Sequence, residues 1–412
     1  MTSSTNDAGT FTLPGMVNLH SHAFQRGMAG LGERAGTGED SFWTWREVMY
    51  RFLDHLTPDD VEAIATMAYV EMLEAGYTRV CEFHYLHHDI DGRPYANLAE
   101  MAERIAAAAS TTGIGLTLLP VLYSHGGFGG QPSVPGQRRF LNDTDRFLKL
   151  REASVGAVSG LPGAVVGAAP HSLRAVTLQQ LRAVLAAVPV APIHIHVAEQ
   201  EKEVADCLAW SGKRPVEWLL DTGMVDARWC LIHATHVTPA EVAGMAKSGA
   251  VVGLCPITEA NLGDGIFPAV DYWSADGKFG VGTDSNVLIS LAEELRILEY
   301  GQRLRDRRRN RLAAPGHSIG RTVFEVSLAG GRRAGGAASH IADRVILASD
   351  AVEIAGRSGD AMLDAWIFAS GRPLVSEVWV NGRRVIDGGR HIIRAAAEKR
   401  FVATMARLCA ET

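Results

Sequence analysis

Short runs rich in β-branched and apolar residues recur along most of the chain, and helical patterns separate them. These runs predict strands at residues 16–20, 78–84, 116–123, 164–171, 193–199, 229–235, 250–256 and 279–286. Strands that alternate with helices pair in parallel, because each helix returns the chain to the edge where the next strand begins. Eight such units are the number that closes a parallel sheet into a (β/α)8 barrel. The alternation therefore predicts an α/β chain with a TIM-like barrel.

The segments between the strands carry the signals of helix ends. In TPDDVEAIATMAYVEMLEAG, Thr57 and Asp60 form a capping pair and Gly76 closes the pattern. In TPAEVAGMAKSG, Thr238 and Gly249 take the same places. An open doubly wound sheet would also alternate strands and helices. However, no G-x-G-x-x-G follows the first strand and no G-x-x-x-x-G-K-[ST] occurs, so we favour the closed barrel.

Composition restricts the class of protein. The chain has 412 residues, which suits a barrel with a small appendage, and a net charge of −6. This acidity disfavours general binding to nucleic acid or to anionic membranes, so any anion site must be a local cluster of arginines. Five cysteines without a C-x-x-C pair disfavour a disulfide framework and a thiolate zinc site. Without a signal-peptide pattern or an apolar stretch of membrane-spanning length, we expect a cytoplasmic protein.

The pattern changes near residue 341. DAWIFA (364–369) and VSEVWVNGRRVIDGGR (375–390) predict strands, with Asn381-Gly382 as a hairpin turn, and a short helix follows. We therefore expect three parts. They are a short N-terminal segment of a small β domain (1–14), the barrel (15–340), and a C-terminal β appendage with the terminal helix (341–412).

Polar side chains gather at the carboxyl ends of five predicted strands, the ends that share one face of a barrel and carry its chemistry. These residues are His20 and His22 at the first strand, His171 and Arg174 at the fourth, His194, His196 and Glu199 at the fifth, His233 and His236 at the sixth, and Asp284 at the eighth. His20 and His22 are two positions apart, so on a strand both rings would lie on the same side. We expect this end of the barrel to hold the functional site.

Each of these residues alone has an ordinary explanation. A single histidine on a strand is more often a hydrogen-bonded core residue than a ligand, and an aspartate after a strand often caps a helix. Five such strand ends in one barrel favour a site instead. Imidazole nitrogens with one carboxylate suit a borderline cation such as Zn²⁺, with one position open for water. On this interpretation His20 and His22 form half of a metal site.

The order of these motifs resembles the amidohydrolase superfamily, in its one-metal deaminase branch. The motifs are H-x-H, a fifth-strand His with H-x-x-E, a sixth-strand His and an eighth-strand Asp. Two-metal members place a Lys at the end of the fourth strand, where this chain has His171. Within the branch, the chain resembles the formimidoylglutamate deiminase family. That resemblance covers nearly the whole chain, through NLHSHAFQRGMAGL, FWTWREVMY, EFHYLHH, APHSLRAVT, HIHVAEQ, CPITEANLGDGIFP and GTDSNVLISLAEELRILEYGQRLR. Members usually carry strands of the small β domain before the barrel, so the short segment 1–14 predicts a reduced appendage or a truncated start.

The resemblance implies one divalent metal ion per chain, with Zn²⁺ as the first candidate and Fe²⁺ as the alternative. Its ligands would be His20, His22, His196 and Asp284. His196 is chosen over His194 because Glu199 follows it at the H-x-x-E spacing. The ion would make hydroxide available near neutral pH.

The resemblance also implies the catalytic roles and the reaction. Asp284 would accept the proton of the water, His233 would orient the hydroxide, and Glu199 would transfer a proton so that ammonia leaves. The reaction would be the hydrolytic deimination of N-formimino-L-glutamate to N-formyl-L-glutamate and ammonia, a step of histidine degradation.

Such a small dicarboxylate amidine needs cationic groups around it. The resemblance implies that Arg46 and Arg174 bind the carboxylates, that Gln25 and Tyr85 assist them, and that His171 hydrogen-bonds the substrate. A surface ion pair is the ordinary alternative for each arginine. Three other functions stay open at this point: a one-metal deaminase of a nucleobase-like amine, a deiminase of N-guanidino-glutarate, and an inactive scaffold. A homodimer is expected because it is common among relatives.

Overall fold

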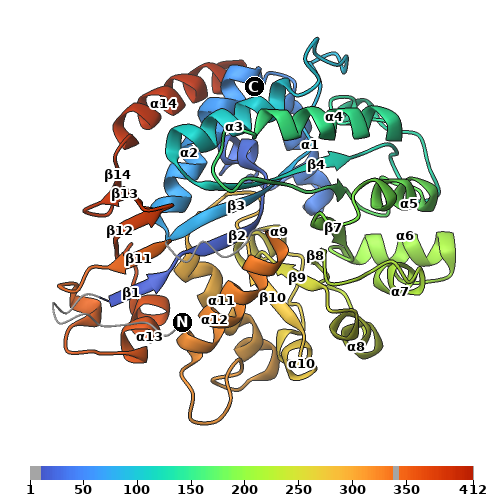
Figure 1. Cartoon of the computed structure of the whole chain (residues 1–412). Helices are drawn as coiled ribbons and strands as arrows, with labels where there is room; N and C mark the ends of the chain where they lie inside the picture. Colours follow the sequence, from blue (N-terminus) through green and yellow to red (C-terminus); the bar gives the residue numbers. More distant parts are fainter. Residues whose placement is uncertain (1–10, 337–342, 412) are drawn as a thin grey trace.

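The computed structural model describes residues 11–336 and 343–411. Parallel strands form a barrel, and helices surround it (Figure 1). The barrel strands are β2 (Met16–Ser21), β3 (Tyr77–His84), β4 (Gly115–Leu122), β5 (Val165–Val166) with β6 (Ala169–Pro170), β7 (Ile193–Val197), β8 (Trp229–His233), β9 (Val251–Leu254) and β10 (Lys278–Val281). Each predicted strand has its counterpart here, so the predicted (β/α)8 barrel is confirmed.

Two parallel ladders close on each other to make the barrel. The first ladder runs β2-β3-β4-β5 and the second runs β7-β8-β9-β10. Parallel bridges from Ala168 to Ile193 and from Ser21 to Asp284 join them. The second bridge places the end of the first barrel strand beside the end of the last, and this closure positions the site described below.

The fourth strand differs from its prediction. One strand was expected over 164–171, whereas two short strands, β5 and β6, occupy this place. Arg151 explains part of the break, because its guanidinium donates to the carbonyl oxygens of Val166 and Gly167, at 2.9 Å each. A side chain thus occupies carbonyl groups at the point where the strand is interrupted.

Helices and short turns lie around the barrel strands. They are α1 (Phe42–Leu53), α2 (Pro58–Glu74), α3 (Glu100–Thr112), α4 (Thr144–Ala157), α5 (Leu178–Ala187), α6 (Glu201–Ser211), α7 (Pro215–Asp221), α8 (Pro239–Ser248), α9 (Pro256–Leu262), α10 (Ala269–Ser274), α11 (Leu291–Asp306) and α12 (Ile319–Ala334), with short 3₁₀ turns η1 (Ala23–Met28) and η2 (Pro135–Gln137). Thr57 and Asp60 form the expected capping box of α2, and Thr238 caps α8. Gly249 ends α8 at a φ of 76°, in the left-handed region that glycine adopts without strain.

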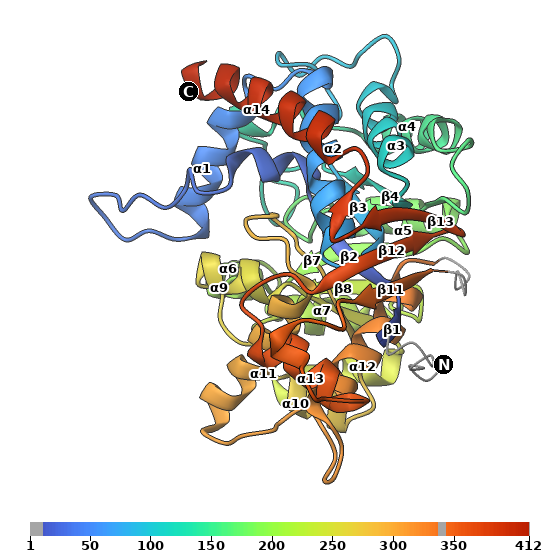
Figure 2. The ribbon, with the colours of Figure 1, turned by 90° about the vertical axis from the view of Figure 1, so that its left-hand side faces the viewer.

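Strands from both ends of the chain form a separate antiparallel sheet beside the barrel (Figure 2). Its order is β1 (Phe11–Pro14), β11 (Arg344–Leu347), β12 (Val375–Val380), β13 (Arg383–Asp387) and β14 (Arg390–His391). The turn between β12 and β13 has positive φ at Asn381 (49°) and Gly382 (77°), as a two-residue hairpin turn requires. The predicted hairpin is confirmed. Of the predicted N-terminal segment 1–14, residues 1–10 lie outside the described residues and 11–14 form the edge strand β1.

Two predictions for the C-terminal part were wrong in detail. DAWIFA was expected to be a strand, but it belongs to helix α13 (Asp360–Ala369), which follows the 3₁₀ turn η3 (Val352–Ile354). A short apolar run does not separate a strand from a buried helix by itself, and α13 buries this run against α11 and α12. The terminal helix α14 (Arg394–Glu411) has 18 residues rather than being short, and it packs on α2. Neither α14 nor any other described helix is both long and apolar enough to cross a membrane.

Helix α12 packs unusually closely on the barrel at a glycine. A Cβ atom at Gly330 would lie 1.9 Å from the carbonyl oxygen of Phe279 on β10. No side chain fits that gap without moving the helix. Gly330 therefore fixes how tightly α12 covers the last barrel strand.

Candidate active site and metal centre

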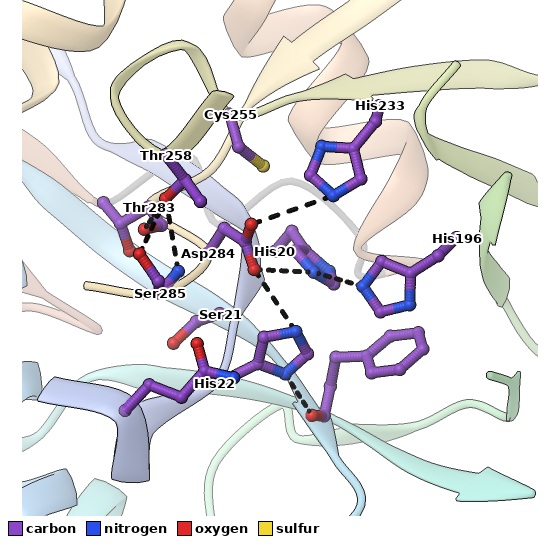
Figure 3. Close-up of polar contacts among 12 residues, drawn as sticks. His20, Ser21, His22, His196, His233, Cys255, Thr258, Thr283, Asp284 and Ser285 are labelled. Carbon is purple, nitrogen blue, oxygen red and sulfur yellow. Dashed lines mark hydrogen bonds and ion pairs between the residues drawn. The ribbon is translucent and has the colours of Figure 1, made fainter. Parts of the chain in front are cut away.

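The four residues expected to bind a metal come from the carboxyl ends of three barrel strands. His20 lies on β2, His22 follows β2, His196 lies on β7 and Asp284 follows β10. Each offers one ligand atom, and these atoms all lie within 4.8 Å of one another. Asp284 faces the three imidazole rings (Figure 3). We refer to these four residues as the donor cluster.

Backbone carbonyl groups fix the orientation of two of these rings. Nδ1 of His22 lies 2.9 Å from the carbonyl oxygen of Phe83, and Nδ1 of His196 lies 3.1 Å from that of His171. A carbonyl oxygen only accepts hydrogen bonds, so each Nδ1 carries a proton and donates it, and Nε2 is the nitrogen that each ring turns toward the donor cluster. This arrangement is typical of histidines that bind a metal through Nε2.

The centre of the donor cluster also fits a cation electrostatically. Nε2 of His196 lies 3.0 Å from Nε2 of His20. Burial lowers the pKa of His20 to about 3, so this ring is neutral. Neutral nitrogens that converge beside a carboxylate form the ligand set that Zn²⁺ and Fe²⁺ accept. The residues present therefore fit a bound divalent ion.

Asp284 is held in a strained backbone conformation. Its φ is 44°, a region that residues other than glycine seldom adopt. Backbone hydrogen bonds of 2.9 Å with His20 and His22 fix it there. Burial alone would raise the pKa of Asp284, but its contacts with the two histidine rings, at 3.3 and 3.2 Å, hold that pKa well below its usual range. The carboxylate is therefore ionised, as a metal ligand must be.

Glu199 and His233 lie beside the donor cluster. Oε1 of Glu199 is 3.9 Å from Nε2 of His233, and the same nitrogen is 3.7 Å from Oδ2 of Asp284. Burial raises the pKa of Glu199. Burial opposes a charged His233, yet the neighbouring carboxylates, Glu199 first, raise the pKa of this ring above its usual value. Near neutral pH Glu199 can therefore gain or lose a proton, whereas His233 keeps its proton and acts as a hydrogen-bond donor.

Glu259, on α9, belongs to the site but was not singled out from the sequence. Its Oε1 lies 3.1 Å from Nδ1 of His233 and accepts a hydrogen bond of 2.9 Å from the backbone N–H of Cys255. Glu259 thus turns Nε2 of His233 toward Glu199 and Asp284. Its place soon after the seventh barrel strand is a signal, but a glutamate at the start of a helix is common.

One cavity is lined by three of the four residues of the donor cluster and by every residue expected to bind substrate. Its lining includes His22, His196, Asp284, Glu199 and His233, together with Gln25, Arg46, Tyr85, His171 and Arg174. His20 lies just beneath this lining, with no exposed surface. Aromatic side chains, Phe42, Trp45, Tyr50, Tyr123 and Phe140, form much of the remaining wall. The fold therefore brings the whole predicted set together.

The two arginines of the cavity keep hydrogen-bonding capacity. Nε of Arg46 and Nε of Arg174 are buried, and neither has a partner within the described part of the chain. Both guanidinium groups lie near the ring of Trp43, at 4.6 and 5.5 Å from its centre. A buried cationic donor without an acceptor is costly unless a ligand supplies one, so these two groups fit an anionic ligand.

Of the other residues singled out from the sequence, Gln25 and Tyr85 line the cavity and His194 does not. Gln25 donates to the Tyr85 hydroxyl at 2.7 Å, and that hydroxyl contacts Sδ of Met49 at 3.2 Å, so these side chains hold one another in the cavity wall. His194, the alternative fifth-strand histidine, lies outside the donor cluster. Its Nε2 is 2.9 Å from the carbonyl oxygen of Ala334, the last residue of α12, and it lies two residues closer to the start of β7 than His196 does.

The sequence profile of the amidohydrolase family matches residues 11–316. The chain belongs to the amidohydrolase family. A formimidoylglutamate deiminase of Pseudomonas aeruginosa is 55% identical over 408 residues, which cover 97% of this chain and 90% of that one. An 8-oxoguanine deaminase of the same organism is 28% identical over 71% of this chain and 64% of its own length. The family assignment made from the motifs is confirmed.

Solved structures agree with this assignment. An amidohydrolase from Brucella melitensis superposes with a TM-score of 0.93 and 57% identity, covering 97% of this chain and 90% of that one. An adenosine deaminase from Xanthomonas campestris, solved with bound zinc, has a TM-score of 0.81 at 23% identity, covering 98% and 87%. The second likeness shows that the amidohydrolase fold is shared. Amidohydrolases are metal-dependent enzymes, and the donor cluster is this chain's candidate metal site.

Proposed function

We propose that this amidohydrolase hydrolyses N-formimino-L-glutamate to N-formyl-L-glutamate and ammonia, a reaction of histidine degradation. The observation that carries the proposal is one cavity that combines the donor cluster with two arginines whose Nε groups have no partner among the described residues. The Pseudomonas aeruginosa deiminase, at 55% identity over nearly the whole chain, supports the same reaction.

The residues His20, His22, His196 and Asp284 would hold one divalent ion per chain, with Zn²⁺ as the first candidate. When bound, such an ion lowers the pKa of a water molecule so that hydroxide is available near neutral pH. The Nδ1–H groups of His22 and His196 keep their carbonyl partners, so both rings are oriented before any ion binds.

The remaining steps belong to the side chains of this chain. His233, held by Glu259, orients the attacking oxygen toward the formimino carbon, and Asp284 accepts the proton that this oxygen loses. A carbon–oxygen bond forms and the carbon–nitrogen double bond becomes single. Glu199 transfers to the imine nitrogen the first proton of the water, so that =NH becomes NH2. The oxygen then loses its second proton through Asp284 and forms a double bond to carbon, this proton reaches the nitrogen, the carbon–nitrogen bond breaks, and ammonia leaves. The formyl group remains on the glutamate nitrogen.

Arg46 and Arg174 would bind the two carboxylates of the substrate, with Gln25, Tyr85 and His171 completing the polar wall. A neutral nucleobase carries no negative charge to pair with two cations, so the arginines disfavour a nucleobase deaminase. N-guanidino-glutarate has the same two carboxylates and stays as the second candidate substrate. The chain has all four residues of the donor cluster and also Glu199 and His233, which argues against an inactive scaffold.

Ammonia release from a small set of compounds tests the proposal. The set is N-formimino-L-glutamate, N-formimino-L-aspartate, N-guanidino-glutarate, guanine and cytosine, assayed with metal-loaded protein. We expect the highest kcat/KM for N-formimino-L-glutamate. A preference for either nucleobase would refute the proposal, and a preference for N-guanidino-glutarate would change the substrate but keep the carboxylate assignment.

Two further proposals concern the state of the protein. We propose a homodimer, which sedimentation of the purified chain would test, and a cytoplasmic location, which fractionation of the source cells would test. A monomer at working concentration would contradict the first.

A further inference from the structure

Three tyrosine rings surround Phe140 in the wall of the cavity. The ring centres of Tyr50, Tyr85 and Tyr123 lie 6.3, 4.9 and 5.6 Å from that of Phe140. The hydroxyl of Tyr85 already has a protein acceptor, Sδ of Met49 at 3.2 Å. The hydroxyl of Tyr123 differs, because it accepts a hydrogen bond and has no acceptor of its own among the described residues.

The direction of that hydrogen bond follows from the neighbouring backbone. Oε1 of Gln137 accepts from the backbone N–H of Val134 at 2.9 Å. A backbone N–H only donates, so the oxygen of the Gln137 amide must face it and the NH₂ group must point the other way. This NH₂ group then donates to the Tyr123 hydroxyl at 2.7 Å. The phenolic oxygen is occupied as an acceptor, so its own proton is free to donate.

The cavity is where this proton can find an acceptor. Tyr123 lines the cavity and is 6% exposed, while Gln137 behind it is 1% exposed. Burial raises the pKa of Tyr123, and the positive charges of Arg174 and Arg46 act against that rise. The hydroxyl therefore keeps its proton, and Tyr123 lines the same cavity as Arg46 and Arg174. An acceptor that suits two cations and a neutral O–H donor is a carboxylate.

We propose that the Tyr123 hydroxyl, oriented by Gln137, is the neutral donor that completes the carboxylate-binding site between Arg46 and Arg174. This inference deepens the proposed function and rests on it for the identity of the substrate. Tyr123 is then a specificity-determining residue that contacts substrate, and Gln137 is a positioning residue that acts through it.

The first test replaces only the hydroxyl. Tyr123→Phe should lower kcat/KM for N-formimino-L-glutamate by about tenfold or more, as expected for the loss of a hydrogen bond to a charged acceptor. It should weaken the binding of glutarate, measured by calorimetry, by a similar factor. Tyr300→Phe is the matched control, since Tyr300 lies on the surface, partly exposed, and should change neither quantity. Wild-type values in Tyr123→Phe would overturn the inference.

The second test concerns Gln137. Gln137→Met removes the amide donor at similar length and should also weaken glutarate binding. If Gln137 acts through Tyr123, the double variant should bind glutarate no more weakly than Tyr123→Phe alone. Additive losses would show a merely structural role for Gln137 and overturn its part of the inference.

Glutarate binding also separates this inference from the proposed function. If the wild-type protein binds glutarate but does not deiminate N-formimino-L-glutamate, the proposed reaction fails while the effect of Tyr123→Phe on glutarate still decides the inference. If the wild-type protein turns over the substrate and Tyr123→Phe matches it, only the inference fails. Wild-type protein that binds no glutarate would overturn the carboxylate site itself.

Discussion

Replacing Arg174 by methionine is the most informative change to the proposed carboxylate site. The side chain is buried, its Nε has no partner in the described part of the chain, and methionine keeps much of its length without the charge. A lost hydrogen bond between charged groups costs about 1.5–3 kcal/mol. At about 1.4 kcal/mol per tenfold change, kcat/KM for N-formimino-L-glutamate should fall by about ten- to one-hundredfold.

Arg174 also acts on the proton-transfer group. Its Nη2 lies 3.9 Å from Oε2 of Glu199, and its charge lowers the pKa of a carboxyl that burial raises. Removing the positive charge therefore raises the pKa of Glu199 further. In the plot of kcat/KM against pH, the limb that reports the ionisation of Glu199 should therefore move to higher pH in Arg174→Met. Loss of substrate binding alone would not produce this shift.

Steady-state ammonia release across pH measures both effects. Metal content should equal that of the wild-type protein, and the slow hydrolysis of formamidine, which has no carboxylate, should change little at its own pH optimum. Arg309→Met, on an exposed surface, is the matched control. Unchanged kcat/KM for the dicarboxylate, with an unmoved pH limb, would refute the placement of Arg174 in the site.

Other changes test the remaining parts of the site and the fold. His22→Ala should lower the metal content measured by elemental analysis of the purified protein, and two bound ions per wild-type chain would contradict the one-metal assignment. Glu199→Gln should keep the metal and reduce kcat by about a hundredfold, so a near-normal turnover would remove this residue from proton transfer. Glu259→Gln removes a carboxylate that raises the pKa of His233, so the corresponding limb of the pH profile should move to lower pH, with the metal retained. Gly330→Ala should destabilise the fold by several kcal/mol, because its Cβ would lie 1.9 Å from a β10 carbonyl oxygen; an unchanged melting temperature would show that α12 can move away.

The barrel and the donor cluster could be predicted because both follow from local patterns. Alternating strands and helices dictate a parallel barrel, and a barrel places the residues that end its strands on one face. His20 and His22 share a side of β2 through simple alternation, while the parallel ladders carry His196 and Asp284 to the same end. None of these steps depends on knowing which side chains touch.

The residues missed by the sequence depend on contacts between distant segments. Glu259 matters because its oxygen meets His233, and Tyr123 matters because Gln137 occupies its oxygen. No spacing in the chain encodes either pair. The strand predicted for DAWIFA was wrong for a similar reason. This segment is a helix because burial against α11 and α12 favours one, and its own periodicity does not show this.

The site divides its work between two kinds of structure. The donor cluster comes from strand ends whose positions are fixed by ladder hydrogen bonds and by the bridge between Ser21 and Asp284. The proposed carboxylate-binding groups come from segments outside the barrel strands: Arg46 from α1, Tyr123 from the residue after β4, and Arg174 from the connection after β6. Gln137, which positions Tyr123, lies on η2. Connections tolerate change that strand ends do not, because no ladder fixes their course. Relatives with this fold can therefore keep the same hydrolytic centre and exchange only the segments that select the substrate. In this chain those segments supply two cations and one oriented hydroxyl, a combination that fits carboxylates and does not fit a neutral base.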